Sequence, residues 1–138
     1  MDSLERFVSA QARDYGTALA EIRSGHKRSH WMWYIFPQIA GLGMSYTAQL
    51  YAIKDIEEAR QYIAHPVLGA RLIEISQALL TLDCSDAAAV MGYPDDLKLR
   101  SCMTLFAQVS DDPVFDAVLA KFYGGMADAR TLELLSLT

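Results

Sequence analysis

The sequence predicts a mainly α-helical fold, a compact single domain over residues 1–138 built as a bundle of about six to eight short helices with little or no sheet. Apolar residues recur at helical spacing between capping residues, glycines and prolines along most of the chain. The alternation that is typical of half-buried strands is not convincing over any stretch of four or more residues. With 138 residues, 52% of them apolar, the chain is long enough to bury one core without disulfides.

Two capping boxes mark helix starts in the first half of the chain. Asp2 with Glu5 opens a helix that ends at Gly25, because glycine readily adopts the backbone of a helix stop. Asp55 with Glu58 opens a shorter helix. That helix must end before the His-Pro pair that follows it, because the residue before a proline disfavours helical geometry.

In the second half, prolines and further caps set the helix starts. Pro66 is expected at the first position of a helix, and Ser85 at the cap of a one-turn helix. Pro94, Asp112 and Asp128 open the last three helices. The apolar residues predicted to face the core are Leu68, Leu72, Ile75, Leu79, Leu82, Leu99, Cys102, Met103, Phe106, Val109, Phe115, Val118, Leu119, Phe122, Leu132 and Leu135.

A stretch of 25 residues without a formal charge, 29–53, is rich in aromatic side chains. It is long enough to cross a bilayer, but a proline, two glycines and several polar side chains make it too interrupted for a spanning helix, so no membrane contact is expected. Pro37 breaks any helix that begins at His30, while Gly41 and Gly43 permit backbone conformations that other residues resist. We expect this loop to lie closely against the core or against a ligand.

Charge and cysteine content exclude several classes of protein. The net charge of −5 argues against general binding of nucleic acid or anionic membranes, which needs a clustered basic surface. Cys84 and Cys102 have no metal-site or redox spacing and are too few for a disulfide framework, so a reducing cytoplasm is the expected location. The N-terminal residues carry no secretion signal, and no cofactor is expected.

The densest basic cluster, 23–30, directly precedes the aromatic residues. His26 and His30 are four residues apart, as two metal ligands on a helix would be, but Lys27 and Arg28 would repel a cation and no third ligand is evident. No metal site is therefore expected. The cluster is either a solvated loop or an anion site beside aromatic faces that can stack on a base.

A second polar cluster lies on the helix that Pro94 opens. With the apolar face inward, the side chains expected on the opposite side are Arg100, Ser101, Thr104 and Gln108. Asp96 and Arg100 are four apart, so an exposed ion pair explains them without a ligand. If that side faces a cleft, Arg100 can grip an anion with two hydrogen bonds, and Ser101 or Thr104 can add others.

Candidate catalytic residues are few. The sequence contains no nucleophile elbow, phosphate loop, dinucleotide fingerprint or metal motif. Acid–base catalysis needs a carboxylate or a histidine held in a pocket. The candidates are His30, from the uncharged stretch, and two carboxylates that helix capping does not explain, Glu21 and Asp96.

Several segments together resemble a bacterial family, the domain-of-unknown-function 1810 family. They are HWMWYIFPQIAGLG from His30, EARQYIAHPVLGARL from Glu58, KLRSCMTLFA from Lys98 and FDAVLAKFYGG from Phe115. The resemblance runs over nearly the whole chain, and the first motif is highly specific. It implies a mainly α-helical single domain and no settled activity.

The order of elements is also similar to that of the NADAR family, which includes N-glycosidases acting on phosphorylated riboflavin intermediates and enzymes acting on ADP-ribosylated bases. In that family an aromatic helix begins with a Glu-His pair, whereas Ser29 precedes His30 here. The resemblance implies that the carboxylate needed to stabilise an oxocarbenium-like state comes from Glu21 or Asp96, or that the protein binds its ligand without cleaving it.

Two hypotheses for the function result. The first is a pocket for a nucleotide-like or ADP-ribose-like anion, with N-glycosidic hydrolysis as the candidate reaction. The ligand-binding residues of this hypothesis are Lys27, Arg28, His30, Trp31, Trp33, Gln38, Arg100, Ser101 and Thr104. Because residues two apart cannot share a helix face, one tryptophan is expected in the core and the other in the wall of a groove.

The second hypothesis is a non-catalytic interaction domain that forms a homodimer or binds a partner through its aromatic surface. The two hypotheses differ in geometry. A pocket would gather His30, Gln38 and Arg100 around a void, whereas an interface would expose Trp31 or Trp33 on a flat patch.

Overall fold

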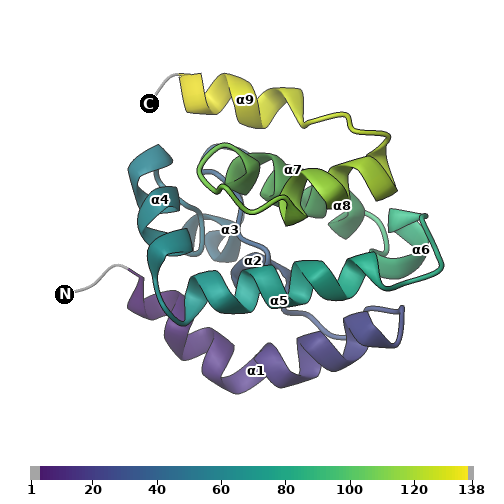
Figure 1. The fold of residues 1–138 in the computed structure, drawn as a ribbon. Coiled ribbons are helices and arrows are strands. Elements are labelled where there is room, and N and C mark those ends of the chain that lie inside the picture. The colour runs from purple at the N-terminus through teal and green to yellow at the C-terminus, as the bar shows by residue number, and fades with distance from the viewer. Residues whose placement is uncertain (1–3, 137–138) are drawn as a thin grey trace.

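The computed structural model describes residues 4–136, which form helices joined by short loops (Figure 1). The helices are α1 (Glu5–Arg23), α2 (Met32–Ile35), α3 (Tyr46–Leu50), α4 (Ile56–Ala64), α5 (Leu68–Leu80), α6 (Ala87–Met91), α7 (Asp95–Ala107), α8 (Val114–Tyr123) and α9 (Ala129–Ser136). The mainly α-helical prediction is confirmed. Within residues 4–136, the only strand pairing is an isolated parallel bridge between Ile39 and Ile53. The helices exceed the expected six to eight because the apolar pattern gives no signal for α3, which is 5 residues long.

Buried aromatic rings connect the helices through one core. In Figure 1, α5 lies between α1 and the pair formed by α7 and α8, and α9 lies beyond α7. The ring of Tyr62 on α4 lies 5.2 Å from that of Phe7 on α1 and 5.2 Å from that of Phe106 on α7. Phe106 in turn lies 6.0 Å from Phe115 on α8. All four rings are fully buried, and aromatic side chains remove more area from water than other core residues do.

The second half of α7 is buried on nearly all sides, which corrects the polar side predicted for it. Ser101 and Thr104 are buried because the start of α9 packs against them. The Thr104 hydroxyl accepts a hydrogen bond of 2.8 Å from the N–H of Asp128, and the Ser101 hydroxyl donates to the Asp128 carboxylate at 3.3 Å. Gln108, by contrast, is exposed as predicted.

Arg100 also differs from the prediction. No ion pair joins it to Asp96 in the described part of the chain. Its guanidinium instead donates to the carbonyl of Met126 at 2.8 Å and to that of Ala127 at 3.0 Å. These carbonyls lie in the loop between α8 and α9, outside the hydrogen bonding of either helix, and the planar guanidinium can reach both at once. Arg100 therefore fastens α7 to this loop.

The helix starts in the middle of the chain follow local capping. The Asp55 carboxylate accepts a hydrogen bond of 2.9 Å from the N–H of Glu58, so the predicted cap of α4 is confirmed. α5 begins at Leu68, later than the proline expected at its first position. His65 caps the turn that contains Pro66: its Nδ1 accepts hydrogen bonds of 3.1 and 3.2 Å from the N–H groups of Val67 and Leu68, and its carbonyl accepts one of 3.0 Å from Gly69. The capping role predicted for Asp2 lies outside the described residues.

Two further expectations are wrong. Asp86 rather than Ser85 caps α6, because the Asp86 carboxylate accepts hydrogen bonds of 3.0 and 3.3 Å from two N–H groups in the first turn. On α9, Leu132 is 39% exposed and Thr131 is buried instead. The Thr131 hydroxyl donates to Asp128 at 2.6 Å, and this contact turns the following residue outward.

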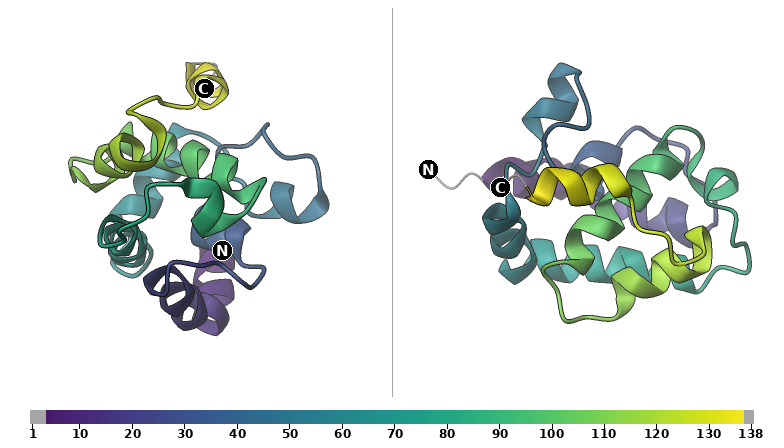
Figure 2. Two further views of the ribbon diagram at one scale, coloured as in Figure 1. Left: turned by 90° about the vertical axis from the view of Figure 1, so that its right-hand side faces the viewer. Right: turned by 90° about the horizontal axis from the view of Figure 1, so that it is seen from above.

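A flap, residues 40–52, carries α3 and stands out from the body of the molecule (Figure 2). Its two ends are held side by side: the N–H of Ala40 donates to the carbonyl of Ile53 at 2.8 Å, and the N–H of Ile53 donates to the carbonyl of Gln38 at 2.8 Å. The Arg6 guanidinium donates to two carbonyls near the end of the flap, each at 2.8 Å. α3 has no buried residue, so the flap is anchored at its ends and open along its length.

The glycines of this loop are required by close approach. Gly41 has a φ of +104°, and a Cβ atom there would lie 3.1 Å from the side chain of Leu134 on α9. At Gly43 a Cβ atom would lie 2.5 Å from that of Ala48. At Gly43 the clash would distort the flap itself, whereas at Gly41 the Leu134 side chain would have to give way and the positive φ would be strained. Of the two expected alternatives, the core or a ligand, the structure shows contact with another part of the chain at Gly41, which lies close to α9.

Candidate functional site

A cleft of about 330 Å³ opens between the flap and the first half of α7. Its lining comprises Trp33, Gln38, Leu42, Gly43, Met44, Ser45, Ala48, Pro94, Leu97, Lys98 and Ser101. Most of these side chains are apolar and a few are polar, which is the composition typical of small-molecule sites. Of the ligand-binding residues predicted from the sequence, Trp33, Gln38 and Ser101 line this cleft.

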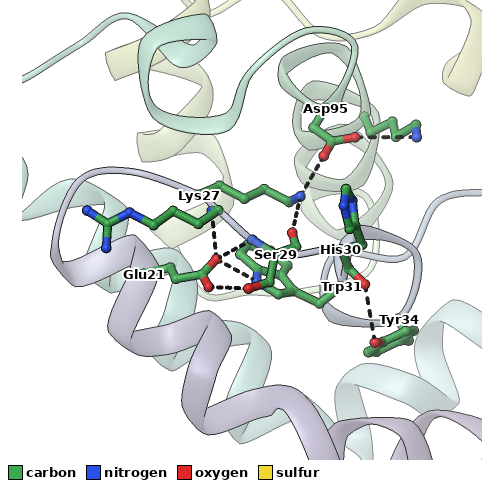
Figure 3. Close-up of polar contacts among 9 residues, drawn as sticks. Glu21, Lys27, Ser29, His30, Trp31, Tyr34 and Asp95 are labelled. Carbon is green, nitrogen blue, oxygen red and sulfur yellow. Dashed lines mark hydrogen bonds and ion pairs between the residues drawn. The ribbon is translucent and has the colours of Figure 1, made fainter.

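Lys98 supplies the positive charge of the cleft. Its Nζ lies 4.8 Å from the centroid of the Trp33 ring, within the range of a cation–π contact. It also lies 3.3 Å from one oxygen of Asp95, whose other oxygen lies 2.9 Å from Nζ of Lys27 (Figure 3). One carboxylate therefore faces two ammonium groups, so the set keeps an uncompensated positive charge beside the cleft.

Lys27 holds the loop after α1 against α7 and does not line the cleft. Its side chain is 7% exposed, and its Nζ donates to the carbonyl of Ser29 at 2.5 Å. The same Nζ lies 4.8 Å from the Trp31 ring centroid, and the backbone N–H donates to the carbonyl of Val90 at 2.8 Å. The ion pair of Lys27 with Asp95 is therefore a structural link between the loop and α7.

The Glu21 carboxylate, near the end of α1, accepts four hydrogen bonds from the loop that follows (Figure 3). Its Oε1 accepts from the N–H groups of Arg28 at 2.8 Å and Ser29 at 2.9 Å, and from the indole of Trp31 at 3.0 Å. Its Oε2 accepts from the Ser29 hydroxyl at 2.6 Å. Burial acts to raise the pKa of Glu21, but these hydrogen bonds outweigh burial and lower the pKa to about 2. Glu21 is a fixed carboxylate at neutral pH.

The other predicted cations and hydrogen-bonding residues lie away from the cleft. Arg28 and His30 are exposed and outside the cleft lining. Arg100 binds the loop before α9, and Thr104 is buried against Asp128. The structure thus separates the two predicted clusters, and Asp95 rather than Arg100 is the residue of α7 that meets the basic loop.

None of the three candidate catalytic residues lines the cleft. Glu21 is committed to the loop, and His30 is exposed. Asp96 has one carboxylate oxygen, Oδ1, that is buried without a hydrogen-bond partner among the described residues. No side chain in the described lining of the cleft carries a carboxylate or an imidazole. Lys98 is the one titratable side chain in that lining, and it carries a positive charge at neutral pH.

The two tryptophans separate as predicted. Trp31 is 1% exposed and belongs to the core, whereas Trp33 is half-buried and lines the cleft. The indole N–H of Trp33 and the side-chain amide of Gln38 make no hydrogen bond within residues 4–136. Gln38 therefore meets the geometry expected of a pocket, while His30 and Arg100 do not.

Among the described residues, no group of three or more His, Cys, Asp or Glu side chains could hold a metal ion. None of the helices in that part of the chain is long and apolar enough to cross a membrane.

Comparison with known proteins gives one family. The family model described as "Protein of unknown function (DUF1810)" matches residues 1–135. The chain belongs to the DUF1810 family. It is also similar to the conserved hypothetical protein Rv1873 from Mycobacterium tuberculosis, whose crystal structure superposes with a TM-score of 0.95 at 48% sequence identity, over 98% of this chain and 97% of that one. Among curated proteins, none matches.

The expected resemblance to the DUF1810 family is therefore confirmed over almost the whole chain. The more distant similarity to the NADAR family is not shown by these comparisons. Neither the family description nor the name of Rv1873 specifies a ligand or a reaction.

Sequence reasoning missed Lys98 and the flap side chains of this DUF1810 protein. Lys98 lies three residues after Asp95, a spacing that predicts a helix-surface pair, and the 3.3 Å contact has that geometry. What the spacing does not reveal is that the flap lies beside this turn of α7. That arrangement depends on contacts between residues far apart in the chain.

Replacing Glu21 tests the loop network of the DUF1810 protein. We expect Glu21→Gln to lower the free energy of unfolding at pH 7 by about 1–3 kcal/mol, because an amide presents its NH₂ group to donors that need an acceptor. Urea denaturation followed by circular dichroism measures this change. Glu57→Gln is the matched control, since the Glu57 side chain is 65% exposed and forms only a 3.8 Å surface pair. Equal stability of the two variants would contradict the structural role of Glu21.

The pH dependence of stability follows from the same carboxylate. Its pKa is about 2 in the folded protein against an ordinary value of 4.5. Glu21 therefore stabilises the fold above the ordinary pKa, and this contribution is lost as the pH falls from 4.5 toward 2. In unfolding measured between these pH values, we expect a shallower loss of stability for Glu21→Gln than for the wild type or Glu57→Gln. Parallel curves would show that the carboxylate is not held as described.

Proposed function

We propose that the cleft binds a small anionic molecule with a planar ring, of the nucleotide-like or ADP-ribose-like class. The observation that carries this function is the position of Lys98, which lies 4.8 Å from the Trp33 ring while sharing one carboxylate with Lys27. An aromatic face with an incompletely neutralised cation beside it suits a ring that bears an anionic group.

The size of the cleft agrees with such a ligand. A volume of about 330 Å³ is near the lower end of the range for small-molecule sites, which begins at about 300 Å³. The cleft therefore has room for one ring system and the anionic group attached to it. The second half of a longer ligand such as ADP-ribose would extend from the open side of the cleft into solvent.

We propose binding without N-glycosidic hydrolysis. Breaking a glycosidic bond passes through an oxocarbenium-like state that a carboxylate stabilises. The described lining of the cleft contains no carboxylate, and Glu21 is held in the loop network with a pKa of about 2. These features support a binding protein over a hydrolase.

Thermal unfolding with a panel of AMP, ADP-ribose, NAD and flavin mononucleotide tests the proposed function. A ligand at a hundredfold excess over its Kd stabilises the folded protein by about 2.7 kcal/mol. For a domain of this size the melting temperature should rise by roughly 6–15 °C. A flat response across the panel would contradict the proposal.

Variants then locate the site. We expect Lys98→Ala to weaken binding of the ligand that responds by about tenfold or more, because a hydrogen bond to a charged group is lost. Trp33→Ala should weaken it similarly through lost stacking. Lys54→Ala is the control, since Lys54 is exposed and outside the cleft lining. Equal binding by all three variants, measured by titration calorimetry, would move the ligand away from this cleft.

A second candidate function is self-association through the rim of the cleft. Met44 on the flap and Leu97 on α7 are 82% and 49% exposed. Tyr46 and Tyr93, each next in the chain to a residue of the cleft lining, are 81% and 79% exposed. Met44 and Leu97 line the same cleft, so apolar surface continues across its mouth. Surface of this kind is typical of interfaces. Neither tryptophan contributes to it as a flat exposed patch, so the interface differs from the one expected from the sequence.

Sedimentation velocity distinguishes this second function. If the rim forms a homodimer, the wild type should sediment as a dimer and the double variant Met44→Ser, Tyr46→Ser as a monomer, because both side chains would lose their apolar contact area. A monomeric wild type at high protein concentration would exclude the homodimer.

A further inference from the structure

Given the anion-binding function proposed above, on which this inference rests, we propose that the side-chain amide of Gln38 selects the ligand by the edge of its ring. The ring would present a hydrogen-bond donor next to an acceptor, as a nucleobase does. Gln38 would be a specificity-determining residue, distinct from the charge contact of Lys98 and the stacking contact of Trp33.

The hydrogen-bonding capacity of Gln38 sets it apart from the other polar side chains of the cleft. The Ser101 hydroxyl shares its one proton between the carbonyl of Leu97 at 3.2 Å and the carboxylate of Asp128 at 3.3 Å. The Ser45 hydroxyl accepts from the N–H of Ala48 at 3.1 Å as the cap of α3. The Gln38 amide makes no hydrogen bond within residues 4–136, so both its donor and its acceptor are available.

The backbone around Gln38 is fixed on both sides. Pro37 and Ile39, its two neighbours, are buried. The carbonyl of Gln38 accepts a hydrogen bond of 2.8 Å from Ile53, and the next N–H along, that of Ala40, donates to Ile53 at 2.8 Å. A side chain on such a base loses less freedom when it binds, because its backbone is already ordered. The unpaired amide is therefore presented to the cleft from a rigid support.

The chemistry of the amide defines the ligand class. A primary amide carries an N–H donor and a carbonyl acceptor side by side, so it can form two parallel hydrogen bonds with a ring edge that has one of each. Adenine offers such an edge at its amino group and the adjacent ring nitrogen. Uracil and guanine offer one at a ring N–H and the adjacent carbonyl, which the amide meets after a half-turn about its terminal bond. Two-bond contacts of this kind discriminate between ring edges by about 5- to 150-fold.

Replacing the Gln38 amide changes which ring edge of the ligand the side chain can hydrogen-bond. In Gln38→Glu the carboxylate only accepts hydrogen bonds, so it suits two adjacent donors, which guanine has and adenine and uracil lack. In Gln38→Met the side chain keeps a similar length and offers no strong donor or acceptor. Titration calorimetry of the wild type and both variants with AMP, UMP, GMP and ribose 5-phosphate compares the three chemistries. Ribose 5-phosphate reports the anion contact alone, because it has no base.

The added negative charge of Gln38→Glu should weaken every anionic ligand, so each affinity is compared with that for ribose 5-phosphate. On this scale we expect Gln38→Glu to lose at least about tenfold in affinity for AMP and UMP and none for GMP. Gln38→Met should weaken binding of all three nucleotides toward the affinity of ribose 5-phosphate. Circular dichroism melts of both variants check the fold, and Gln38→Met carries the test if the charged variant does not fold.

Two other results would overturn the inference in distinguishable ways. If the wild type binds nucleotides and both variants bind each of them with unchanged affinity, Gln38 does not read the ring, and the proposed anion binding stands. If the wild type binds neither the nucleotides nor ribose 5-phosphate, the proposed function fails, and the role of Gln38 fails with it.

Discussion

The hydrogen bonds to the Glu21 carboxylate are the contacts on which the rest of the site depends. A carboxylate removed from water is costly unless its oxygens are hydrogen-bonded, and here the loop after α1 supplies those bonds from two backbone N–H groups and the Trp31 indole. Gly25, with a φ of +83°, ends α1 as predicted and lets the loop turn back. The turn places Trp31 in the core and begins the short helix that carries Trp33 to the cleft.

The same loop also determines the charge at the cleft. It carries Lys27 to Asp95, in a pair whose lysine side chain is 7% exposed. Because Asp95 is shared, Lys98 keeps a partly uncompensated charge beside Trp33. Breaking a buried pair by removing one partner costs more than the pair contributes in net terms, so the first turn of α7 is tied to the loop. Asp95, which holds the loop, and Lys98, which lines the cleft, therefore lie one turn apart on α7.

What the sequence predicted well depends on local contacts. Spacings of a few residues predict the mainly α-helical fold and the cap at Asp55. They also predict that one tryptophan is buried in the core while the other lines a groove. The features that the sequence did not predict depend on contacts between residues far apart in the chain. Thr104 is buried because Asp128 covers it, and Lys98 lines a cleft because the flap lies beside it. No local pattern shows that backbone N–H groups converge on Glu21, so sequence reasoning offered it as a catalytic candidate.

Titration of nitrogen-15-labelled protein with AMP, followed through the indole N–H signals of the two tryptophans, tests binding at the cleft most directly. Trp31 is buried and hydrogen-bonded to Glu21, so its signal serves as an internal reference. Trp33 lines the cleft and makes no hydrogen bond within residues 4–136. Binding between Trp33 and Lys98 predicts a saturable shift of the Trp33 signal and a stationary Trp31 signal. Saturable AMP binding that leaves the Trp33 signal unmoved, or no response of either tryptophan at saturating concentrations, would contradict a nucleotide site in this cleft.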